Sequence, residues 1–324
     1  MVTKEEVVLA YRLFLGREPE NEHVVNNLAQ TSHSIEKLRS EFLISSEFRQ
    51  LASKMLEVDV VDRHRHPFNT PFIPVETEIS EPLLTQLFSR IQEQWFNLGN
   101  SEPYWSVLTQ PQYFVDNFDN YSEQFFFSGD GLCFLFLAAL RRNGVNPNLL
   151  NSCLELGSGV GRVTIHLADK FPHVTAVDVS KPHLEILRQK LTELHIENVD
   201  IQQLEKIDQL SSLPKCDAVF TVITLQHNPP PVSASLLKAL LDLLNPKGVA
   251  YFQIATYKTG YLFEVERYLP SEQSRSFEMH FLPQHDIFKI IQEANCICLE
   301  VREDGMVGNE DSMLSNTFLV QKNA

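Results

Sequence analysis

The sequence predicts an α/β protein with a doubly wound, mostly parallel sheet, preceded by a small all-α domain. From residue 151 onward, short apolar runs alternate with amphipathic helical patterns, which is the order typical of a doubly wound sheet. Before residue 56, the apolar residues recur at helical spacing instead. The 324 residues therefore divide into a short helical part and a larger α/β part.

The first 55 residues carry two helical patterns. The first spans residues 4–15 and is ended by Gly16; the second begins after Ser34, a good N-cap residue, and runs to about residue 51. Tyr11, the tripeptide LGR at 15–17 and the tetrapeptide SSEF at 45–48 resemble the DUF4214 family. The tryptophan expected in the middle of that family is missing. The resemblance implies an accessory helical domain over residues 1–55.

The middle of the chain is less regular. Prolines at positions 67, 71, 74 and 82 without a sustained period predict a linker over 56–82. A helix over 81–98, an aromatic-rich stretch and a helix over 131–142 follow, and we assign 83–150 to a cap over the cofactor and acceptor pocket. Residues 151–324 form the α/β core. Its strands are expected at 152–156, 173–178, 199–204, 217–223, 248–256, 296–303 and 316–322. Its helices are expected at 160–170, 181–195, 233–245 and 284–294.

Composition excludes several classes of protein. The net charge of −15 repels phosphate backbones, so no nucleic-acid partner is expected. The five cysteines form no CxxC pair, which predicts no metal site and no disulfide framework, but reduced thiols in a cytoplasmic protein. The most apolar run, 132–140, is shorter than the roughly 20 residues of a membrane span, so no membrane association is expected.

The segment CLELGSGVGR at 153–162 carries the chemistry. Glycines let the backbone turn tightly and approach a ligand, and the amides at the start of the next helix then face that ligand. A dinucleotide site would need GxGxxG, but the glycines at 157, 159 and 161 form GxGxG, and Arg162 holds the third position. Glu155 would repel a pyrophosphate, whereas it suits the ammonium or sulfonium of S-adenosylmethionine. Both departures favour a methyltransferase over a dehydrogenase.

The second strand ends in Asp178, 21 residues after Gly157. A carboxylate at that position can accept hydrogen bonds from both ribose hydroxyls. The alternative role is a cap on the following helix.

Four segments in this order, LELGSGVGR, TAVDVS, DAVFTVITLQH and LLNPKGVAYFQ, resemble the seven-strand, Rossmann-like methyltransferases that use S-adenosylmethionine. The resemblance covers about residues 125–324 and implies six parallel strands with an antiparallel seventh. It implies a cofactor site that also includes Ser158 and Arg162 of the loop. The implied residues are Glu155, Gly157, Ser158, Gly159, Gly161, Arg162, Asp178, Val179, Glu205, Lys206, Thr221 and, upstream, Gly129.

The methyl acceptor is harder to predict. An alcohol must lose a proton, and a general base near neutral pKa then helps by about 10²- to 10⁴-fold. We consider His227, after the fourth strand, and His280, before the last helix, as candidate bases. Both have the alternative role of packing at the pocket edge. Aromatic and polar residues flank the same region and are expected to bind a small-molecule substrate: Tyr104, Trp105, Tyr113, Gln226 and Tyr257.

Three functions remain open from the sequence. The first is O-methylation of a small organic molecule such as a natural product or a saccharide. The second is N-methylation of a small molecule or peptide; the third is a non-catalytic module that binds S-adenosylmethionine. The absence of NPPY or DPPY after the fourth strand, where LQHNPP stands, argues against adenine or glutamine N-methylation.

Overall fold

The computed structural model describes residues 2–48, 51, 71–272, 277–307 and 312–324, and it separates into two compact units, 1–70 and 71–324. The predicted linker at 56–82 lies partly outside the described residues. For the described residues 71–82 the prediction of a linker is wrong. Ile73 is buried, Val75 pairs with Phe263, and helix α5 begins at Glu81. Extended chain with several prolines can still pack through its apolar side chains.

The N-terminal unit is helical. It contains α1 (Lys4–Ala10), which continues as a π-helical turn (Tyr11–Leu15), then α2 (Glu22–Thr31) and α3 (Ile35–Ile44). Gly16 ends the first helix in the left-handed region, at φ 66°, as predicted. Helix α2, capped by Asn21, was not predicted. The core of the N-terminal unit contains Tyr11 edge-on to Phe42, with ring centroids 5.0 Å apart.

The pieces that resemble DUF4214 meet in this unit. Arg17 of the LGR segment donates two hydrogen bonds to Glu47 of the SSEF segment, of 2.6 and 2.7 Å. The same guanidinium lies over the ring of Tyr11, 5.1 Å from its centroid. The charged pair is partly exposed, so its contribution to stability is modest. It fixes the end of the unit relative to its first helix.

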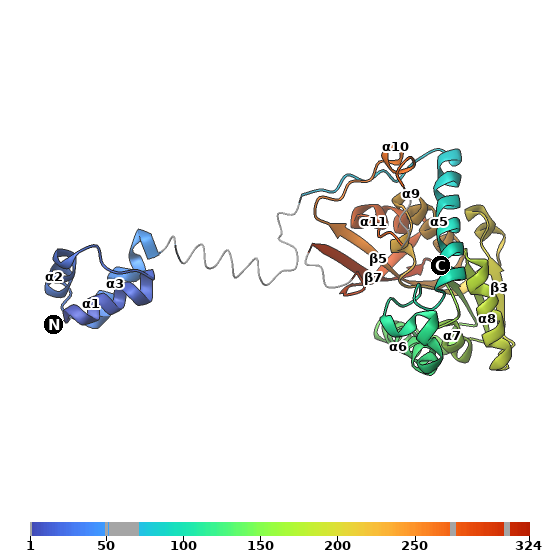
Figure 1. Cartoon of the computed structure of the whole chain (residues 1–324), viewed down its shortest axis with the longest axis horizontal. Helices are drawn as coiled ribbons and strands as arrows, with labels where there is room; N and C mark the ends of the chain where they lie inside the picture. Colours follow the sequence, from blue (N-terminus) through green and yellow to red (C-terminus); the bar gives the residue numbers. More distant parts are fainter. Residues whose placement is uncertain (1, 49–50, 52–70, 273–276, 308–311) are drawn as a thin grey trace. The chain divides into compact units, whose positions relative to one another are not determined.

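The second unit is a seven-stranded sheet covered by helices on both faces (Figure 1). The strands run in the order β3-β2-β1-β4-β5-β7-β6, and β7 is antiparallel to both of its neighbours. The predicted doubly wound sheet with an antiparallel seventh strand is confirmed. The strands are β1 (Ser152–Leu156), β2 (His173–Asp178), β3 (Val199–Gln203), β4 (Cys216–Thr221), β5 (Leu244–Lys258), β6 (Cys296–Asp304) and β7 (Met313–Lys322).

The helices of this unit are α5 (Glu81–Ser101), α6 (Ser122–Arg142), α7 (Thr164–Lys170), α8 (Lys181–Glu193), α9 (Pro230–Asp242), α10 (Val265–Tyr268) and α11 (Gln284–Glu293). Helix α6 begins nine residues before the predicted start at 131, and it includes the predicted irregular aromatics at 125–127. Strand β5 begins at Leu244, four residues before the predicted start at 248, and its register against β4 shifts between Cys216 and Ala218.

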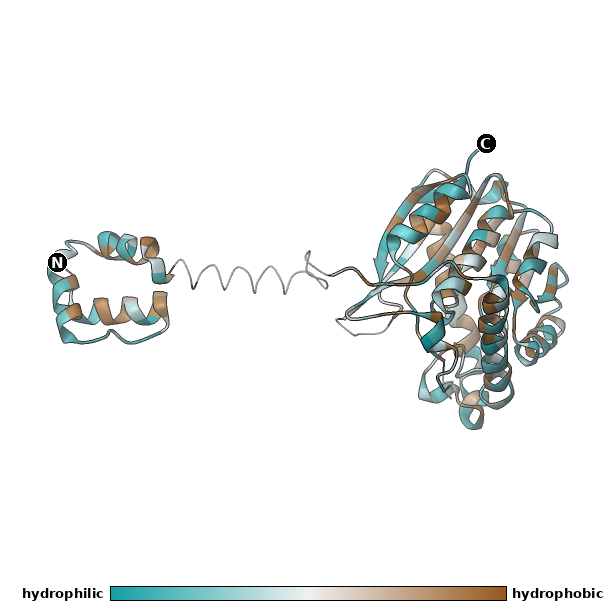
Figure 2. Ribbon diagram, turned by 90° about the horizontal axis from the view of Figure 1, so that it is seen from above, coloured by the Kyte–Doolittle hydropathy of each residue, from teal (hydrophilic) through white to brown (hydrophobic). Residues whose placement is uncertain are grey.

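Successive side chains along each strand point to opposite faces of the sheet, so a hydrophobic core forms on each face. Leu154 and Leu156 of β1 face α5, α9 and α11, while Cys153 faces α6 and α7. Figure 2 shows the apolar residues gathered on the strands and on the inner sides of the helices. Helix α6 is long and apolar enough to cross a membrane, yet Phe136 and Leu140 on it are fully buried. We therefore regard α6 as a core helix of this unit.

Candidate active site

A cavity opens at the carboxyl ends of β1, β2 and β4, the edge where open α/β sheets bind ligands. Helix α5 and the chain that follows it supply the remaining walls. The predicted cofactor residues that line the cavity are Glu155, Gly157, Ser158, Gly159, Arg162, Asp178 and Val179.

The glycine loop needs its glycines for backbone conformation. Gly157, Gly159 and Gly161 have φ values of 82°, 52° and 90°, in the region that L-residues with side chains rarely adopt. A Cβ on Gly157 would lie 2.0 Å from Oγ1 of Thr224, so the loop and the chain after β4 approach more closely than alanine allows. These positions therefore shape the cavity floor.

Glu155 is a buried carboxylate on that floor. Its Oε2 accepts a 2.6 Å hydrogen bond from Thr164, and burial raises the pKa of Glu155 to about 7 despite this bond and the nearby Arg162. Burial also lowers the pKa of Arg162, whose Nη1 donates to Ser128. A cation bound beside Glu155 would stabilise its ionised form.

Asp178 ends β2 and is anchored by two backbone amides. Gly159 N donates to Oδ2 and Ser180 N donates to Oδ1, both at 2.8 Å. Ser180 is the N-cap residue of α8, which has no side-chain cap bond, so this bond fixes the turn before the helix and the capping role considered above is wrong. Each carboxylate oxygen of Asp178 can accept a second hydrogen bond.

The other predicted cofactor residues lie elsewhere. Gly161 and Gly129 serve close packing, because a Cβ would lie 2.4 Å from Leu187 Cδ1 and 1.9 Å from the Arg162 carbonyl oxygen, respectively. Glu205 and Lys206 do not line the cavity; their backbone amides donate to Gln209, and it is the preceding Leu204 that forms part of the wall. Thr221 is fully buried and does not line the cavity, and its hydroxyl has no hydrogen-bond partner among the described atoms.

The chain after β4 holds a conformational outlier. Ile223 lines the cavity with a φ of 56°, which is unfavourable for a β-branched residue. Its amide donates a 2.8 Å hydrogen bond to the side chain of Gln253, and Gln253 in turn donates to Gln226. Such strain concentrates at functional sites and persists where neighbouring bonds hold it. Gln226 thus belongs to a buried amide network rather than to the cavity wall.

Neither candidate base is among the residues that line the cavity, but His227 lies directly beside it. Its ring is 5.6 Å from that of Trp95, which does line the cavity. Its Nδ1 lies 2.9 Å from the carbonyl oxygen of Glu278, so Nδ1 carries the proton and Nε2 is the acceptor. Gln226 Nε2 is 3.4 Å from that nitrogen, and burial lowers the pKa of His227 to about 4.

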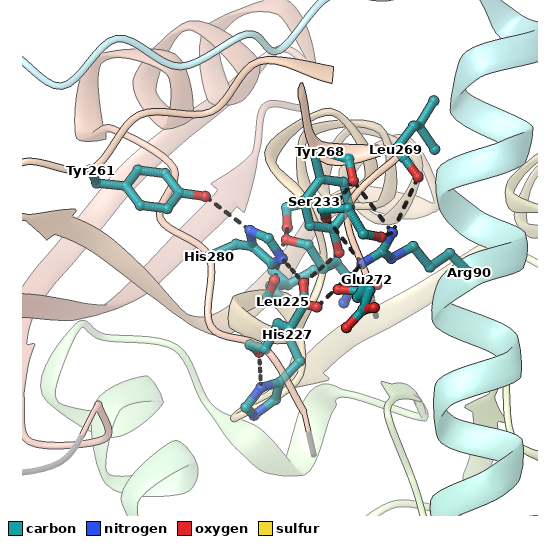
Figure 3. A network of polar contacts seen from close by, with 12 residues as sticks. Arg90, Leu225, His227, Ser233, Tyr261, Tyr268, Leu269, Glu272 and His280 are labelled. Carbon is teal, nitrogen blue, oxygen red and sulfur yellow. Dashed lines mark hydrogen bonds and ion pairs between the residues drawn. The ribbon is translucent and has the colours of Figure 1, made fainter. Parts of the chain in front are cut away.

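The ring of His280 faces the hydroxyl of Tyr261, as Figure 3 shows. Its Nδ1 is 2.9 Å from the hydroxyl of Tyr261, and its Nε2 is 3.4 Å from Glu278. Tyr268 also donates to Glu278. Arg90 of α5 donates to the carbonyl oxygens of Tyr268, Leu269 and Ser271. These bonds tie residues 268–271 to α5.

The predicted substrate residues separate into different places. Tyr104 and Tyr113 belong to a buried aromatic cluster with Phe118 and Phe125. The hydroxyl of Tyr257 donates to the carbonyl of Pro71. Trp105 alone of the five contacts the aromatic side chains beside His227, through Phe277.

Sequence reasoning missed several residues that line the cavity, among them Trp95, Ser106 and His183. His183 is buried and joins the cap to the sheet: Nδ1 is 2.6 Å from Ser180 Oγ, and Nε2 is 2.9 Å from Ser106 Oγ. Burial lowers its pKa. Helical spacing gave no sign of these roles, although the pairing of a histidine with hydroxyls could have been suspected from the Ser180-to-His183 spacing.

Known proteins resemble parts of this chain. The family described as a methyltransferase domain matches residues 153–248. An uncharacterised protein of Rickettsia prowazekii is 30% identical over 122 residues, covering 35% of this chain and 47% of that protein. The ubiquinone biosynthesis O-methyltransferase of Aeromonas salmonicida is 30% identical over 180 residues, covering 52% of this chain and 71% of that protein. The chain thus spans about half of the first relative.

Among solved structures, the magnesium protoporphyrin IX methyltransferase of Synechocystis is similar, with 18% identity and a TM-score of 0.49 over 74% of this chain and all of that one. The fold and the glycine-loop cavity define a nucleotide-type ligand site on a doubly wound sheet. The chain belongs to the S-adenosylmethionine-dependent methyltransferases of the seven-strand, Rossmann-like class. The family match does not include residues 1–55, so their resemblance to DUF4214 stays a prediction.

The cavity fits the cofactor of this family. Ser158 Oγ and Arg162 Nε are buried on its wall without a hydrogen-bond partner among the described atoms. Carboxylates lie at two points of the same wall, Glu155 and Asp178. Buried polar groups normally find partners, so these atoms are suited to receive a polar ligand. Glu155 would take the ammonium group, and Asp178 would take the ribose hydroxyls.

Proposed function

We propose that this chain transfers the methyl group of S-adenosylmethionine to a hydroxyl oxygen of a small organic acceptor, such as a natural product or a saccharide. The observation that carries the choice of oxygen is the state of His227. Its Nδ1 proton is directed to the carbonyl of Glu278 and its ring is neutral near pH 7, so Nε2, which lies 3.4 Å from the Gln226 amide nitrogen, is the ring nitrogen that could take a proton. The name of the Aeromonas relative supports oxygen as the acceptor atom.

The chain's own residues have two tasks in this reaction. S-adenosylmethionine supplies an already activated methyl group, so positioning of the acceptor provides much of the rate. As the acceptor oxygen bonds to carbon it becomes positively charged, and its proton becomes strongly acidic. A weak base such as His227 then suffices to take this proton at Nε2 and release it to solvent.

The proposal also includes a cytoplasmic location and a small-molecule partner. The five cysteines are all free thiols, and burial raises the pKa of Cys153 and Cys216, which keeps them unreactive. Reduced thiols suit the cytoplasm. A small-molecule acceptor, rather than a nucleic acid or a membrane, suits the acidic chain.

The test is production of S-adenosylhomocysteine with a panel of hydroxyl and amine acceptors. For a hydroxyl acceptor, His227→Ala should lower turnover by about 10²-fold, the low end for a general base, because a pKa of about 4 lies well below the working pH. The matched control is His285→Ala, whose side chain is 60% exposed on α11. Turnover of amines alone would replace O-methylation by N-methylation. Cofactor binding without turnover of any acceptor would identify a non-catalytic module.

A further inference from the structure

The outer side of helix α6 is apolar and exposed. Phe127 and Phe134 are 74% and 62% exposed, and Leu135 is 47% exposed. Together with Gly131 these residues have i, i+4, i+7 and i+8 spacing, which places them on one side of the helix. A Cβ added to Gly131 would meet no atom within 4 Å, so this side of the helix is open. We call these four residues the α6 outer face.

Helix α8 shows what an ordinary surface helix of this chain exposes. Its exposed residues are all polar or charged: Lys181, Glu185, Arg188, Gln189, Thr192 and Glu193. On α6, in contrast, Asp130 alone is polar among the five exposed residues between Gln124 and Arg141, and its carboxylate lies 3.8 Å from His166 of α7. Single exposed apolar residues are normal, but a contiguous group of them marks an interaction site.

Opposite charges lie at the two ends of the α6 outer face. Glu123 stands in the first turn of α6, and Arg141 stands in the last turn. Both are exposed, and neither has an ion-pair partner among the residues that the structure describes. They are 18 residues apart, which is about five helical turns, so both lie on the same side of the helix as Phe127 and Phe134.

A second copy of this chain matches both the apolar residues and the charges. An isologous contact joins the same surface patch of two subunits across a two-fold axis. With that axis near Gly131, two α6 helices would run antiparallel, and Phe127 of each copy would lie opposite Leu135 of the other. The same arrangement would bring Glu123 of each copy near Arg141 of the other, so each charge gains a partner. A membrane surface would cover the apolar residues without pairing both ends with their opposite charge.

We propose that the α6 outer face is the contact surface of a homodimer, in which the α6 helices of two copies pack antiparallel about a two-fold axis near Gly131. The proposal concerns assembly and does not depend on the identity of the methyl acceptor. A pair of 21-residue helices is about 30 Å long and buries less area than a standard interface of about 1,600 Å². We therefore expect a reversible dimer with a dissociation constant in the micromolar range.

The test is sedimentation equilibrium of the full chain from about 1 to about 300 µM, which should show a monomer–dimer equilibrium. Phe134→Ser should weaken the dimer at least about 100-fold, because the symmetry removes two buried rings at once. The matched control is Phe96→Ser, 48% exposed on α5, which should leave the dimer unchanged. Both variants should melt at the same temperature at low concentration, since neither ring is part of the core.

Exchange of the two charges distinguishes a second copy from any other occupant. Glu123→Arg alone and Arg141→Glu alone should each weaken the dimer about fivefold or more, because each places like charges opposite one another at two positions. The double variant Glu123→Arg with Arg141→Glu should regain the wild-type affinity, since both pairs re-form with their signs exchanged. Another kind of partner would not change its own charges to match.

The outcomes that would overturn the inference are distinct. They are a chain that stays monomeric over the whole concentration range, a dimer that Phe134→Ser does not weaken, and a double charge variant that dimerises as weakly as the single ones. A monomeric chain that binds phosphatidylcholine vesicles, and no longer binds them as Phe134→Ser, would assign the α6 outer face to a membrane surface instead.

Discussion

Acidification from pH 8 to pH 6 should weaken binding of S-adenosylhomocysteine about tenfold. The reason is Glu155, whose pKa is raised to about 7 by burial in the ligand-free chain. A carboxylate that holds the ligand's ammonium must be ionised, so the bound state has a much lower pKa and binding releases a proton. The ligand therefore loses affinity as pH falls below 7.

The magnitude follows from this pKa. If only the ionised form binds, the apparent dissociation constant scales as one plus the ratio of protonated to ionised Glu155. With a pKa of about 7, that factor is about 1.1 at pH 8, about 2 at pH 7 and about 11 at pH 6. The loss between pH 8 and pH 6 is thus about 1.4 kcal/mol.

Calorimetry measures both parts of this prediction. Titrations at pH 6, 7 and 8 give the affinities, and titrations at pH 7 in two buffers of different ionisation enthalpy give the proton release, expected near one half per ligand. Glu155→Gln keeps the acceptor for Thr164 but cannot ionise. It should bind weakly at every pH, with no slope. A wild-type affinity independent of pH, or a slope retained in Glu155→Gln, would refute the assignment of the ammonium to Glu155.

Three further predictions concern the loop, the base and the N-terminal unit. Gly157→Ala should abolish measurable S-adenosylhomocysteine binding, because φ is 82° and the new Cβ meets Thr224, whereas Gly131→Ala, with open space around its Cβ, should bind normally in the same titration. Turnover of a hydroxyl acceptor should show no titration of His227 between pH 6 and 9, since this base is neutral above a pKa of about 4; an acid limb near pH 6.5 that disappears in His227→Ala would contradict this. Phe42→Ala should destabilise the N-terminal unit by about 3–5 kcal/mol in hydrogen exchange and leave cofactor affinity within about twofold, because the cavity is lined by the second unit alone.

The sequence was most informative where structure depends on neighbours in the chain. Strands β1 and β2 begin and end where predicted, because each is a short apolar run between turn residues. Helix α6 begins nine residues before its predicted start, and the added part contains Gly129. Burial of Phe125, Phe126 and Gly129 against the core outweighs the low helix propensity of glycine. Helix α2 was missed because its pattern is short and mostly polar.

The site also has one half that depends on neighbours in the chain and one half that depends on tertiary packing. The half that receives the cofactor is formed by one loop and the ends of adjacent strands, where glycine spacing and the two carboxylates are visible in the sequence. The aromatic side chains Trp95, His227 and Phe277 beside the cavity meet only through tertiary packing, because 132 residues separate the first two in the chain and 50 separate the last two. No local pattern could predict that Arg90 and Glu278 hold the last of these segments against α5. This explains why the cofactor could be predicted from the sequence and the acceptor class could not. Because these side chains come from separate segments, they can change by single substitutions without disturbing the cofactor loop.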